Sequence, residues 1–314
     1  MISYIDYFVP EARLRVDRIF ECLELEGRIP ANFDTKEDGV GFFSGLLNLS
    51  SVSDGDLMSE SEMLEPVLSK FFNTSLVKPE EVELLILVDD QMDRGCRPAN
   101  FAHYLQHTYK LKKANVLVFS GNHCANLEHV IVHAESMLKA GVVKNILAVA
   151  VNKIVKVSDR IVGNYAVMGD GAGLIYFEND SENGIELRGQ YLFTNGLLYE
   201  STAMDTDNSL LLMKNYMLCL SGLLKKNSIK PNAIKNVIVQ NANPLLISQC
   251  LLSVGFKSEQ IYSDQFASYG HLDCIDFLVN LKSLATSSLK SGHSIVSFGL
   301  GPAGSYIGLY LQVK

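Results

Sequence analysis

Several features that mark other classes of protein are missing from this 314-residue sequence. No apolar run reaches the length of a membrane span, and the first residues lack the basic region and cleavage site of a secretory signal. None of the six cysteines stands in a CxxC pair, which predicts reduced thiols in a cytoplasmic protein. The formal net charge of −8 argues against broad binding to nucleic acid or to a membrane surface. The remaining composition, 47% hydrophobic and 20% charged, is typical of a globular protein.

Strand and helix patterns alternate along the first half of the chain. Strands are predicted at 3–9, 82–88, 115–119 and 145–151, and helices at 11–25, 56–72, 99–109 and 125–141, with a loop at 27–41. This alternation is typical of a parallel sheet covered by helices. The second half has predicted strands at 165–168, 174–177, 184–192, 237–239, 294–298 and 306–313, and helices at 210–224, 244–253 and 275–289. Because its order loosely repeats the first, we expect two related α/β halves with a site between them.

Cys124 stands where a predicted buried strand, 115–119, passes through a tight turn into a helix. Unpaired backbone N–H groups and the helix dipole in the first turn of a helix favour a thiolate. The sequence therefore makes Cys124 a candidate nucleophile. The alternative is that Cys124 is a small buried hydrophobe, as many free cysteines are.

Other candidate sites are less well supported. His103 and His107 have the spacing of metal ligands on a helix, but no third ligand lies nearby in the sequence. His129 and His133 share that spacing, although Glu128 stands in the wrong order for a zinc helix. We therefore predict no metal site.

Four stretches together resemble the ketoacyl-ACP synthase III branch of the thiolase-superfamily condensing enzymes and acyltransferases. The first is Cys124 between strand and helix. The second is the pair Asp159-Arg160 followed by MGDGAG at 168–173, which is similar to the family's glycine turn. QNAN at 240–243 stands where the family has His-Gln-Ala-Asn, and SFGLG at 297–301 is similar to its C-terminal glycine loop. The resemblance covers nearly the whole chain.

The resemblance implies a thiolase-like α/β fold of two pseudo-repeated halves, each with a mixed sheet covered by helices. Residues 1–164 would carry the nucleophile, and residues 165–314 the histidine and the glycine loops. Cys124 would attack a thioester to form an acyl-enzyme, with the backbone N–H groups of Cys124 and Leu300 as the oxyanion hole. The resemblance also implies a homodimer, or a heteromer with a homologous ketosynthase.

The catalytic triad of Cys, His and Asn that the resemblance implies is altered in this sequence. Gln240 occupies the histidine position, and a glutamine side chain cannot take a proton from a thiol at neutral pH. His271 fills the asparagine position, so a Cys124–His271 dyad with Gln240 as a hydrogen-bond donor is chemically workable. Either Asp273 or Asp276 could orient His271, and we favour Asp276 from the pattern in similar subfamilies.

The resemblance further implies that Arg160, Asn243 and Arg97 contact substrate, with Arg97 at the wall of the acyl pocket. A solvated loop charge is the alternative for Arg97. The chain has no tryptophan, and Leu245 stands where the family has an arginine for coenzyme A. We expect no permanently bound cofactor, and a substrate delivered as a thioester on acyl carrier protein phosphopantetheine or on coenzyme A. Because of these two departures, we expect the acyl donor, the acceptor or both to arrive on carrier proteins rather than on free coenzyme A.

The predicted function is thus an acyl-thioester-dependent condensing enzyme or acyltransferase in specialised metabolite or fatty-acid-type biosynthesis. The alternative, motivated by the missing histidine at position 240, is a catalytically impaired structural subunit of a heteromeric ketosynthase-like complex. The acyl chain, the acceptor and the type of bond formed stay open at the level of sequence.

Overall fold

A strand order that occurs twice along the chain organises the fold. The computed structural model describes residues 1–89, 98–179, 184–198 and 206–314. The first group of strands comprises β1 (Ile2–Phe8), β4 (Leu84–Val88), β5 (Asn115–Phe119), β6 (Asn145–Asn152) and β9 (Gly171–Glu178). The second comprises β10 (Ile185–Thr194), β11 (Asn236–Ile238), β12 (Ile261–Tyr262), β13 (Ser294–Gly301) and β14 (Ser305–Val313).

The two groups meet in one sheet, in the order β12-β11-β13-β14-β10-β1-β9-β6-β4-β5. Within each group, the strand order from the outer edge inward is third, second, fourth, fifth and first along the chain. The predicted α/β fold with two repeated halves is therefore confirmed. The division after residue 164 stays a prediction. Along the chain, the first group of strands ends with β9 and the second begins with β10.

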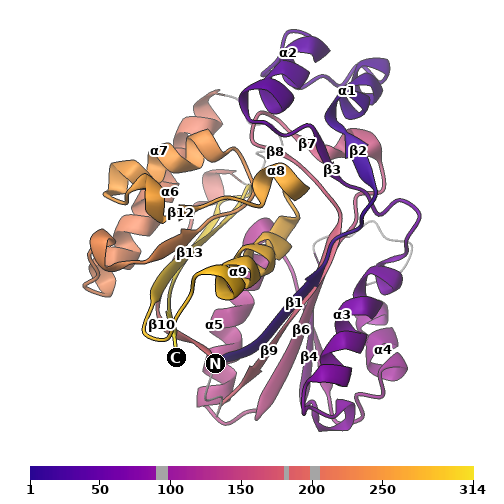
Figure 1. Ribbon diagram of the computed structural model, residues 1–314, viewed down its shortest axis with the longest axis vertical. Helices are drawn as coiled ribbons and strands as arrows, with labels where there is room; N and C mark the ends of the chain where they lie inside the picture. The colour runs from indigo at the N-terminus through magenta and orange to yellow at the C-terminus, as the bar shows by residue number, and fades with distance from the viewer. Residues whose placement is uncertain (90–97, 180–183, 199–205) are drawn as a thin grey trace.

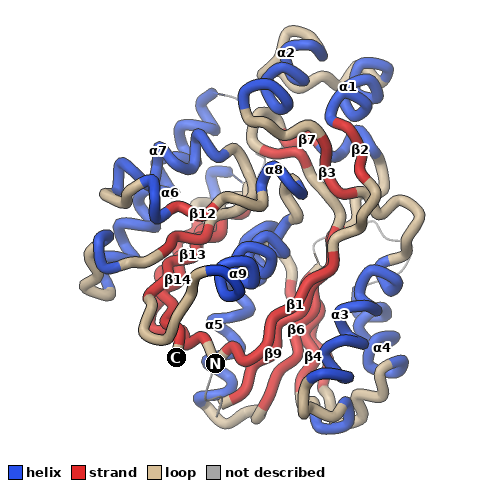
Figure 2. Tube along the Cα trace, in the orientation of Figure 1, coloured by secondary structure: helices blue, strands red, loops and turns tan. Residues whose placement is uncertain are grey.

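Helices fill the space between the two halves of the sheet and cover both outer faces (Figure 1). The central pair is α5 (Asn126–Lys139) and α9 (Asp276–Ser287), whose buried leucine, isoleucine and valine side chains contact strands of both repeats. Helices α3 (Glu60–Thr74) and α4 (Pro98–Thr108) cover the first repeat. Helices α6 (Thr206–Lys226) and α7 (Pro244–Val254) cover the second. The result is five layers, in which α5 and α9 separate the two halves of the sheet (Figure 2).

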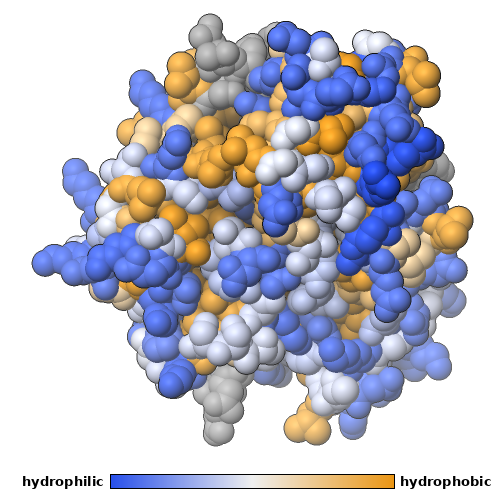
Figure 3. All heavy atoms as spheres, turned by 45° about the horizontal axis from the view of Figure 1, so that its top comes forward, coloured by the Kyte–Doolittle hydropathy of each residue, from blue (hydrophilic) through white to orange (hydrophobic). Residues whose placement is uncertain are grey.

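A cap of small elements lies beyond the carboxyl ends of the first repeat's parallel strands (Figure 1). The cap contains β2 (Arg13–Arg15), α1 (Val16–Leu25), α2 (Lys36–Val40), the π-helix η1 (Gly41–Leu46), β3 (Ser51–Ser53), β7 (Ile161–Val162), β8 (Ala166–Val167) and α8 (Phe266–Tyr269). The loop predicted at 27–41 is wrong in its last part, because Thr35 and Asp38 form a capping box that starts α2. Figure 3 brings this end of the molecule forward and shows apolar side chains gathered across the upper half of the view.

Strand β5 differs from its prediction in burial. The sequence predicts a buried strand, but β5 is the outermost strand of the first repeat, and Leu117 and Val118 are 42% and 37% exposed. An apolar pattern alone does not reveal where a strand stands in the sheet, so an apolar edge strand is indistinguishable from a central one.

Short 3-10 helices complete the described residues: η2 (Pro79–Glu81), η3 (His123–Ala125), η4 (Val157–Arg160), η5 (Gly196–Leu198), η6 (Pro231–Ala233), η7 (Ser258–Gln260) and η8 (Asp273–Ile275). Two of them occupy equivalent places, since η3 leads directly into α5 and η8 leads directly into α9. The repeat brings η3 and η8 into contact between the two halves of the sheet, together with β13. No helix among the described residues has both the length and the apolar character needed to cross a bilayer.

Candidate active site

Cys124 lies at the entrance of the central helix α5. It is part of η3, and it is 9% exposed. The turn before it is tight: Ala125 N–H donates to the carbonyl of Asn122, and His123 has a φ of +49°. This backbone delivers Cys124 to the entrance of α5, where the positive end of the helix dipole favours a thiolate.

His271 lies against the sulfur of Cys124. Its Nε2 atom is 3.1 Å from Sγ, and its Nδ1 atom is 2.5 Å from Oδ2 of Asp276. His271 and Asp276 are each only 1% exposed, so water does not compete for these contacts. The three side chains form a relay in the order carboxylate, imidazole and thiol, which is the arrangement of a nucleophile, its base and the group that orients the base.

Asp276 is held in place by the backbone on two sides. Its Oδ1 accepts from Leu272 N–H at 2.8 Å, and its Oδ2 accepts from Asn241 N–H at 2.6 Å. Asn280, one turn further along α9, donates to the carbonyl of Val239 and to Oδ1 of Asn241. This network links the first turn of α9 to the QNAN stretch. The sequence analysis did not identify Asn280 as part of the site. The feature of the sequence that could have indicated it is a polar residue on an otherwise apolar face of the helix.

The environment of His271 determines its pKa. Burial of the ring lowers the pKa, but the charge of Asp276 and its hydrogen bond raise it, and the charge of Asp273 adds to the increase. The net result is a pKa raised above the ordinary histidine value. A raised pKa makes His271 a stronger base for the proton of Cys124.

The position of His271 depends on glycines next to it. Gly270 has a φ of +72°, and a Cβ atom there would lie 2.5 Å from Val52 Cγ1 and 2.8 Å from the carbonyl oxygen of Val167. Only glycine adopts this conformation in so little space. The backbone of His271 itself is fixed, because its N–H donates to Val167 and its carbonyl accepts from Gly169 N–H. The MGDGAG turn thus supports the histidine directly.

Gln240 contacts the backbone around the nucleophile. Its Nε2 donates to the carbonyl oxygens of Cys124 and Leu300, each at 3.0 Å, and its Oε1 accepts from the hydroxyl of Tyr165 at 3.3 Å. Both amide hydrogens are therefore committed to backbone carbonyls. Gln240 joins the two residues whose N–H groups are the predicted oxyanion hole.

The C-terminal glycine loop packs on the turn that carries Cys124. A Cβ atom at Gly301 would collide with the carbonyl oxygen of Asn122, and a Cβ atom at Gly299 would lie 2.9 Å from Cδ of Glu128. Glycine at position 301 is therefore required for β13 to approach η3 this closely, and a side chain at position 299 would displace the carboxyl of Glu128. This contact places Leu300 next to the nucleophile.

Two aspartates were candidates to orient His271, and they occupy different places. Asp276 bonds to the ring, whereas Asp273 has its Oδ2 atom 3.7 Å from Sγ of Cys124. Asp273 also has a φ of +58°, which is uncommon for a residue with a side chain.

Other residues with predicted roles in substrate binding are engaged within the protein. Arg160 is 1% exposed and pairs with Asp170 at 2.7 Å and Asp54 at 3.2 Å. The pairing fastens the MGDGAG turn to the cap, and the burial of Arg160 keeps it from a bound substrate. Asn243 caps α7, with its Oδ1 accepting from Leu246 N–H at 3.2 Å. Arg97 lies outside the described residues.

Glu128 is a further buried group that the sequence did not identify as part of the site. It follows Cys124 by one helical turn, is 2% exposed and accepts a long hydrogen bond from Ser297 Oγ at 3.4 Å. Burial raises the pKa of its carboxyl to about 8. The protonated form therefore predominates at neutral pH and places no full negative charge beside the relay.

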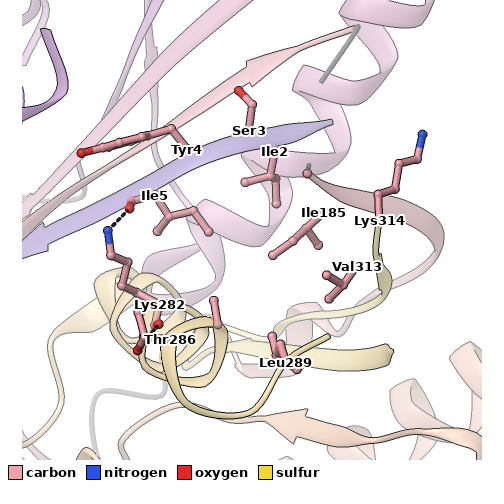
Figure 4. A pocket seen from close by; sticks show the side chains of 12 residues that line it. Ile2, Ser3, Tyr4, Ile5, Ile185, Lys282, Thr286, Leu289, Val313 and Lys314 are labelled. Carbon is pink, nitrogen blue, oxygen red and sulfur yellow. Dashed lines mark hydrogen bonds between the residues drawn. The ribbon is translucent and has the colours of Figure 1, made fainter. Parts of the chain in front are cut away.

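A cavity of about 380 Å³ lies far from this site (Figure 4). It is lined by β1, α9 and the end of β14, and the register of β1 through β9 places Ile2 level with Ile146 at the start of β6. Cys124, in contrast, lies beyond the ends of the parallel strands. Lys282 at this cavity is engaged by the carbonyl of Ile5 and by Asp6. The cavity in Figure 4 is therefore not part of the candidate active site.

Comparison with solved structures identifies the architecture. The chain superposes on 3-oxoacyl-[acyl-carrier-protein] synthase III from Aquifex aeolicus with a TM-score of 0.79 at 17% identity, covering 99% of both chains. This is the ketoacyl-ACP synthase III fold. An acyltransferase, ChlB3, gives a TM-score of 0.79 at 18% identity, covering 99% of this chain and 97% of that one. A histidine-to-asparagine variant of Xanthomonas campestris OleA gives 0.81 at 13% identity, with the same coverage.

The sequence comparisons add nothing to this assignment. No protein-family model matches the chain, and no curated protein matches it. Structural likeness at this level of identity establishes the fold and not the reaction. The synthase III fold therefore agrees with the resemblance found in the motifs, and the reaction must be argued from the site.

Proposed function

We propose that the protein is an acyltransferase that takes an acyl group from a thioester onto Cys124 and passes it to an acceptor. The observation that supports this most directly is the relay of Asp276, His271 and Cys124, with contacts of 2.5 and 3.1 Å. An inactive structural subunit has no need for a buried carboxylate that orients a histidine against a thiol. The complete relay therefore favours catalysis over the structural-subunit alternative.

The chemistry follows from the positions of the three groups. His271 Nε2 takes the proton of the Cys124 thiol, and the sulfur attacks the thioester carbonyl. Backbone N–H groups of Cys124 and Leu300 stabilise the oxyanion, and Gln240 fixes both residues through their carbonyls. When the tetrahedral intermediate collapses, the carrier thiolate leaves and receives the proton from His271. The product of this half-reaction is acyl-Cys124 and a free carrier thiol.

The second half-reaction favours a hydroxyl or amine acceptor. His271 takes the acceptor's proton as its oxygen or nitrogen attacks the acyl carbonyl, and Cys124 leaves and regains that proton. Decarboxylative condensation in this fold is thought to use side-chain donors that hold a malonyl carbonyl. Here both hydrogens of the Gln240 amide are bound to backbone carbonyls, and His271 is bound to Asp276. An ester or amide product therefore agrees better with this site than a new carbon–carbon bond.

The proposed donor is a thioester of phosphopantetheine, carried by an acyl carrier protein or by coenzyme A. Leu245, at the position where the resemblance places an arginine, is 49% exposed at the start of α7. An exposed leucine offers no charge to the phosphates of coenzyme A. This favours delivery by a carrier protein.

Intact-mass measurement tests the acyl-enzyme. Incubation with a panel of short acyl-phosphopantetheine thioesters is expected to add one acyl mass to the wild-type protein, and none to a Cys124→Ala variant. Cys250→Ala is the matched control, because Cys250 is buried in another cluster and burial raises the pKa of its thiol to about 11. Absence of an acyl mass on wild type with every donor would contradict the covalent mechanism and favour a structural subunit.

We further propose that two copies of the chain pair through β5. This strand ends the described sheet, and Leu117 and Val118 expose apolar surface on it. An apolar edge strand with unpaired backbone groups is a liability unless another strand covers it. A second copy can supply that strand across a twofold axis, which yields one continuous sheet.

Light scattering after size exclusion tests this dimer. Wild type is expected to have twice the chain mass, and Leu117→Lys is expected to shift it to the monomer by placing a charge at the centre of the edge. Leu57→Lys is the control, since Leu57 is 96% exposed and lies on a different surface. A dimer that survives Leu117→Lys, or a wild-type monomer at micromolar concentration, would exclude pairing through β5.

A further inference from the structure

A cavity of about 190 Å³ adjoins the nucleophile. Its wall includes His123, which precedes Cys124, and Asp273, whose Oδ2 atom is 3.7 Å from Sγ. The cavity extends to the carboxyl ends of β4 and β6, where Asp89 and Asn152 line it. A water molecule occupies about 30 Å³ in the liquid, so a chain of only a few heavy atoms fits. An acyl group on Cys124 can enter this space.

The wall of the cavity is unusually polar for a site that receives an alkyl chain. Of the described residues that line it, half carry polar side chains: Asp89, His123, Asn126, Asn152 and Asp273. Three of these are deeply buried, with Asp89 3%, Asn126 1% and Asn152 5% exposed. Pockets for apolar ligands have mainly apolar walls with few polar groups.

The polar groups are held in fixed positions. Asn126 Oδ1 accepts from Asn122 N–H at 3.0 Å, Asn152 Nδ2 donates to the carbonyl of Gly169 at 2.8 Å, and Asp273 Oδ1 accepts from Cys274 N–H at 2.6 Å. Such bonds fix the side chains before a ligand arrives, which is the usual design of a binding wall. A carboxylate can accept about four hydrogen bonds, so Asp89 and Asp273 can each accept one from a ligand in addition to their contacts within the protein.

Backbone conformation adds a second indication. His123 and Asp273 line the cavity from opposite repeats, and both have positive φ angles, +49° and +58°. Side chains rarely adopt this region, and where they do, the strain is often part of a functional site. Here the conformation turns both residues toward one cavity next to the sulfur.

A competing space for the acyl chain is much smaller. An apolar recess lies beside Tyr165, Tyr216, Cys250 and Leu300, on the side of the second repeat, with a volume of only about 10 Å³. It would suit an alkyl chain by its chemistry, but its volume is about what a single water molecule requires. Of these two spaces, the polar cavity has more room.

We propose that the acyl group accepted by Cys124 is short and carries a hydroxyl or amino group, which hydrogen-bonds to the wall formed by Asp89, Asn126, Asn152 and Asp273. This inference rests on the acyl-enzyme proposed above and specifies its substrate class. Hydroxyl and amino groups share the required property, since each donates a hydrogen bond to carboxylate or amide oxygens.

A donor panel of equal chain length tests the proposal. Butyryl, 3-hydroxybutyryl and 3-aminobutyryl thioesters of the same pantetheine thiol are supplied to the wild-type protein, and the rate of acyl-Cys124 formation is followed by intact mass. One or both of the polar donors are expected to react about tenfold faster than butyryl, since each hydrogen bond formed contributes up to roughly that factor. An octanoyl thioester is expected to be slower than butyryl, because it exceeds the cavity.

Variants at Asp89, which is remote from the sulfur along the wall, separate the two polar donors. Asp89→Asn keeps hydrogen bonding but removes the charge, so a preference for the amino donor is expected to fall while one for the hydroxy donor persists. Asp89→Leu is expected to abolish the preference for either. Alkylation of Cys124 by iodoacetamide is measured in each variant, so that a change in the nucleophile itself is recognised.

The outcomes distinguish this inference from the proposed function. Acylation by butyryl as fast as by both polar donors would overturn the polar substrate class while leaving the acyl-enzyme intact. If the octanoyl thioester reacted fastest, the polar substrate class would likewise be overturned, and the acyl chain would be assigned to the apolar recess. Failure of every donor in a protein whose Cys124 is readily alkylated would overturn the acyl-enzyme, and the substrate class with it.

Discussion

Replacing His271 with alanine is expected to slow acylation of Cys124 by about 10²–10⁴-fold, the usual contribution of a positioned general base. The reason is geometric: within the described site, His271 Nε2 is the basic nitrogen that contacts Sγ, at 3.1 Å. Without it, the thiol must ionise by itself before it can attack. Stopped-flow or quenched intact-mass measurements with a reactive short-chain thioester give the rate.

The matched control is His133→Ala on the exposed side of α5, which is expected to retain the wild-type rate. Thermal unfolding of both variants shows whether the fold survives. If the His271→Ala protein is folded and acylates at the wild-type rate, then His271 is not the base, and the relay has no catalytic role.

Comparison of His271→Ala with a replacement of Gln240 distinguishes two models of the active site. If the Gln240 side chain were the main hydrogen-bond donor in acylation, its replacement would lower the acylation rate more than the replacement of His271. The structure instead commits the Gln240 amide to the carbonyls of Cys124 and Leu300, so its effect is expected through the placement of the oxyanion hole. In the proposed mechanism, His271 touches the reacting atoms and Gln240 positions the backbone.

Local sequence patterns predicted most of the fold because the apolar pattern of most helices and strands agrees with their burial in the structure. Strands with continuous apolar runs, such as β4 and β6, are buried on both faces, as their composition indicates. The start of α2 was missed, because a capping box at Thr35 and Asp38 outweighed the glycine and polar residues around it. The exposure of β5 could not be predicted, because a strand's place in the sheet order is a property of the whole chain.

The site was predictable where function requires a residue type at a turn, and less so where packing decides. Cys124 could be identified from its strand-to-helix turn, and His271 from the resemblance, which places it at the family's asparagine position. Asp273 and Asp276 are both within reach of His271 in sequence, and only the 3-10 turn between them determines that one bonds to the ring and the other faces Sγ. The sequence alone did not indicate that Arg160 would form a buried ion pair with Asp170.

The repeat explains why these residues meet at all. Cys124 lies in η3, which leads into α5, and His271 lies two residues before η8, which leads into α9, so nucleophile and base come from the entrances to corresponding helices. The contact between η3 and η8 brings these two entrances together between the halves of the sheet. Each entrance contributes one reactive side chain, and the glycine loop of β13 closes the site from the second repeat.

Replacing Asp276 with asparagine is expected to reduce the maximal acylation rate by about 10²–10⁴-fold, by analogy with loss of the carboxylate from a catalytic triad. It is also expected to move the acid limb of the pH–rate profile to lower pH. His271 must be neutral to accept the proton of Cys124, so the rate falls as the pH drops through the pKa of its ring. Burial lowers that pKa, and the charge and hydrogen bond of Asp276 raise it above the ordinary value. Removal of Asp276 leaves burial as the largest influence, so the pKa falls.

The control for this shift is Asp273→Asn. Asp273 also raises the pKa of His271, but it is the weakest of the identified causes, so the acid limb is expected to move less and in the same direction. Measurement of acyl-Cys124 formation between about pH 5 and 8, the range over which histidine usually titrates, locates the limb in all three proteins. An Asp276→Asn limb at the wild-type position, or a larger shift for Asp273→Asn, would mean that Asp276 does not govern the ring. In that case Asp273, the carboxylate beside the sulfur, would be the group that sets the protonation of the site.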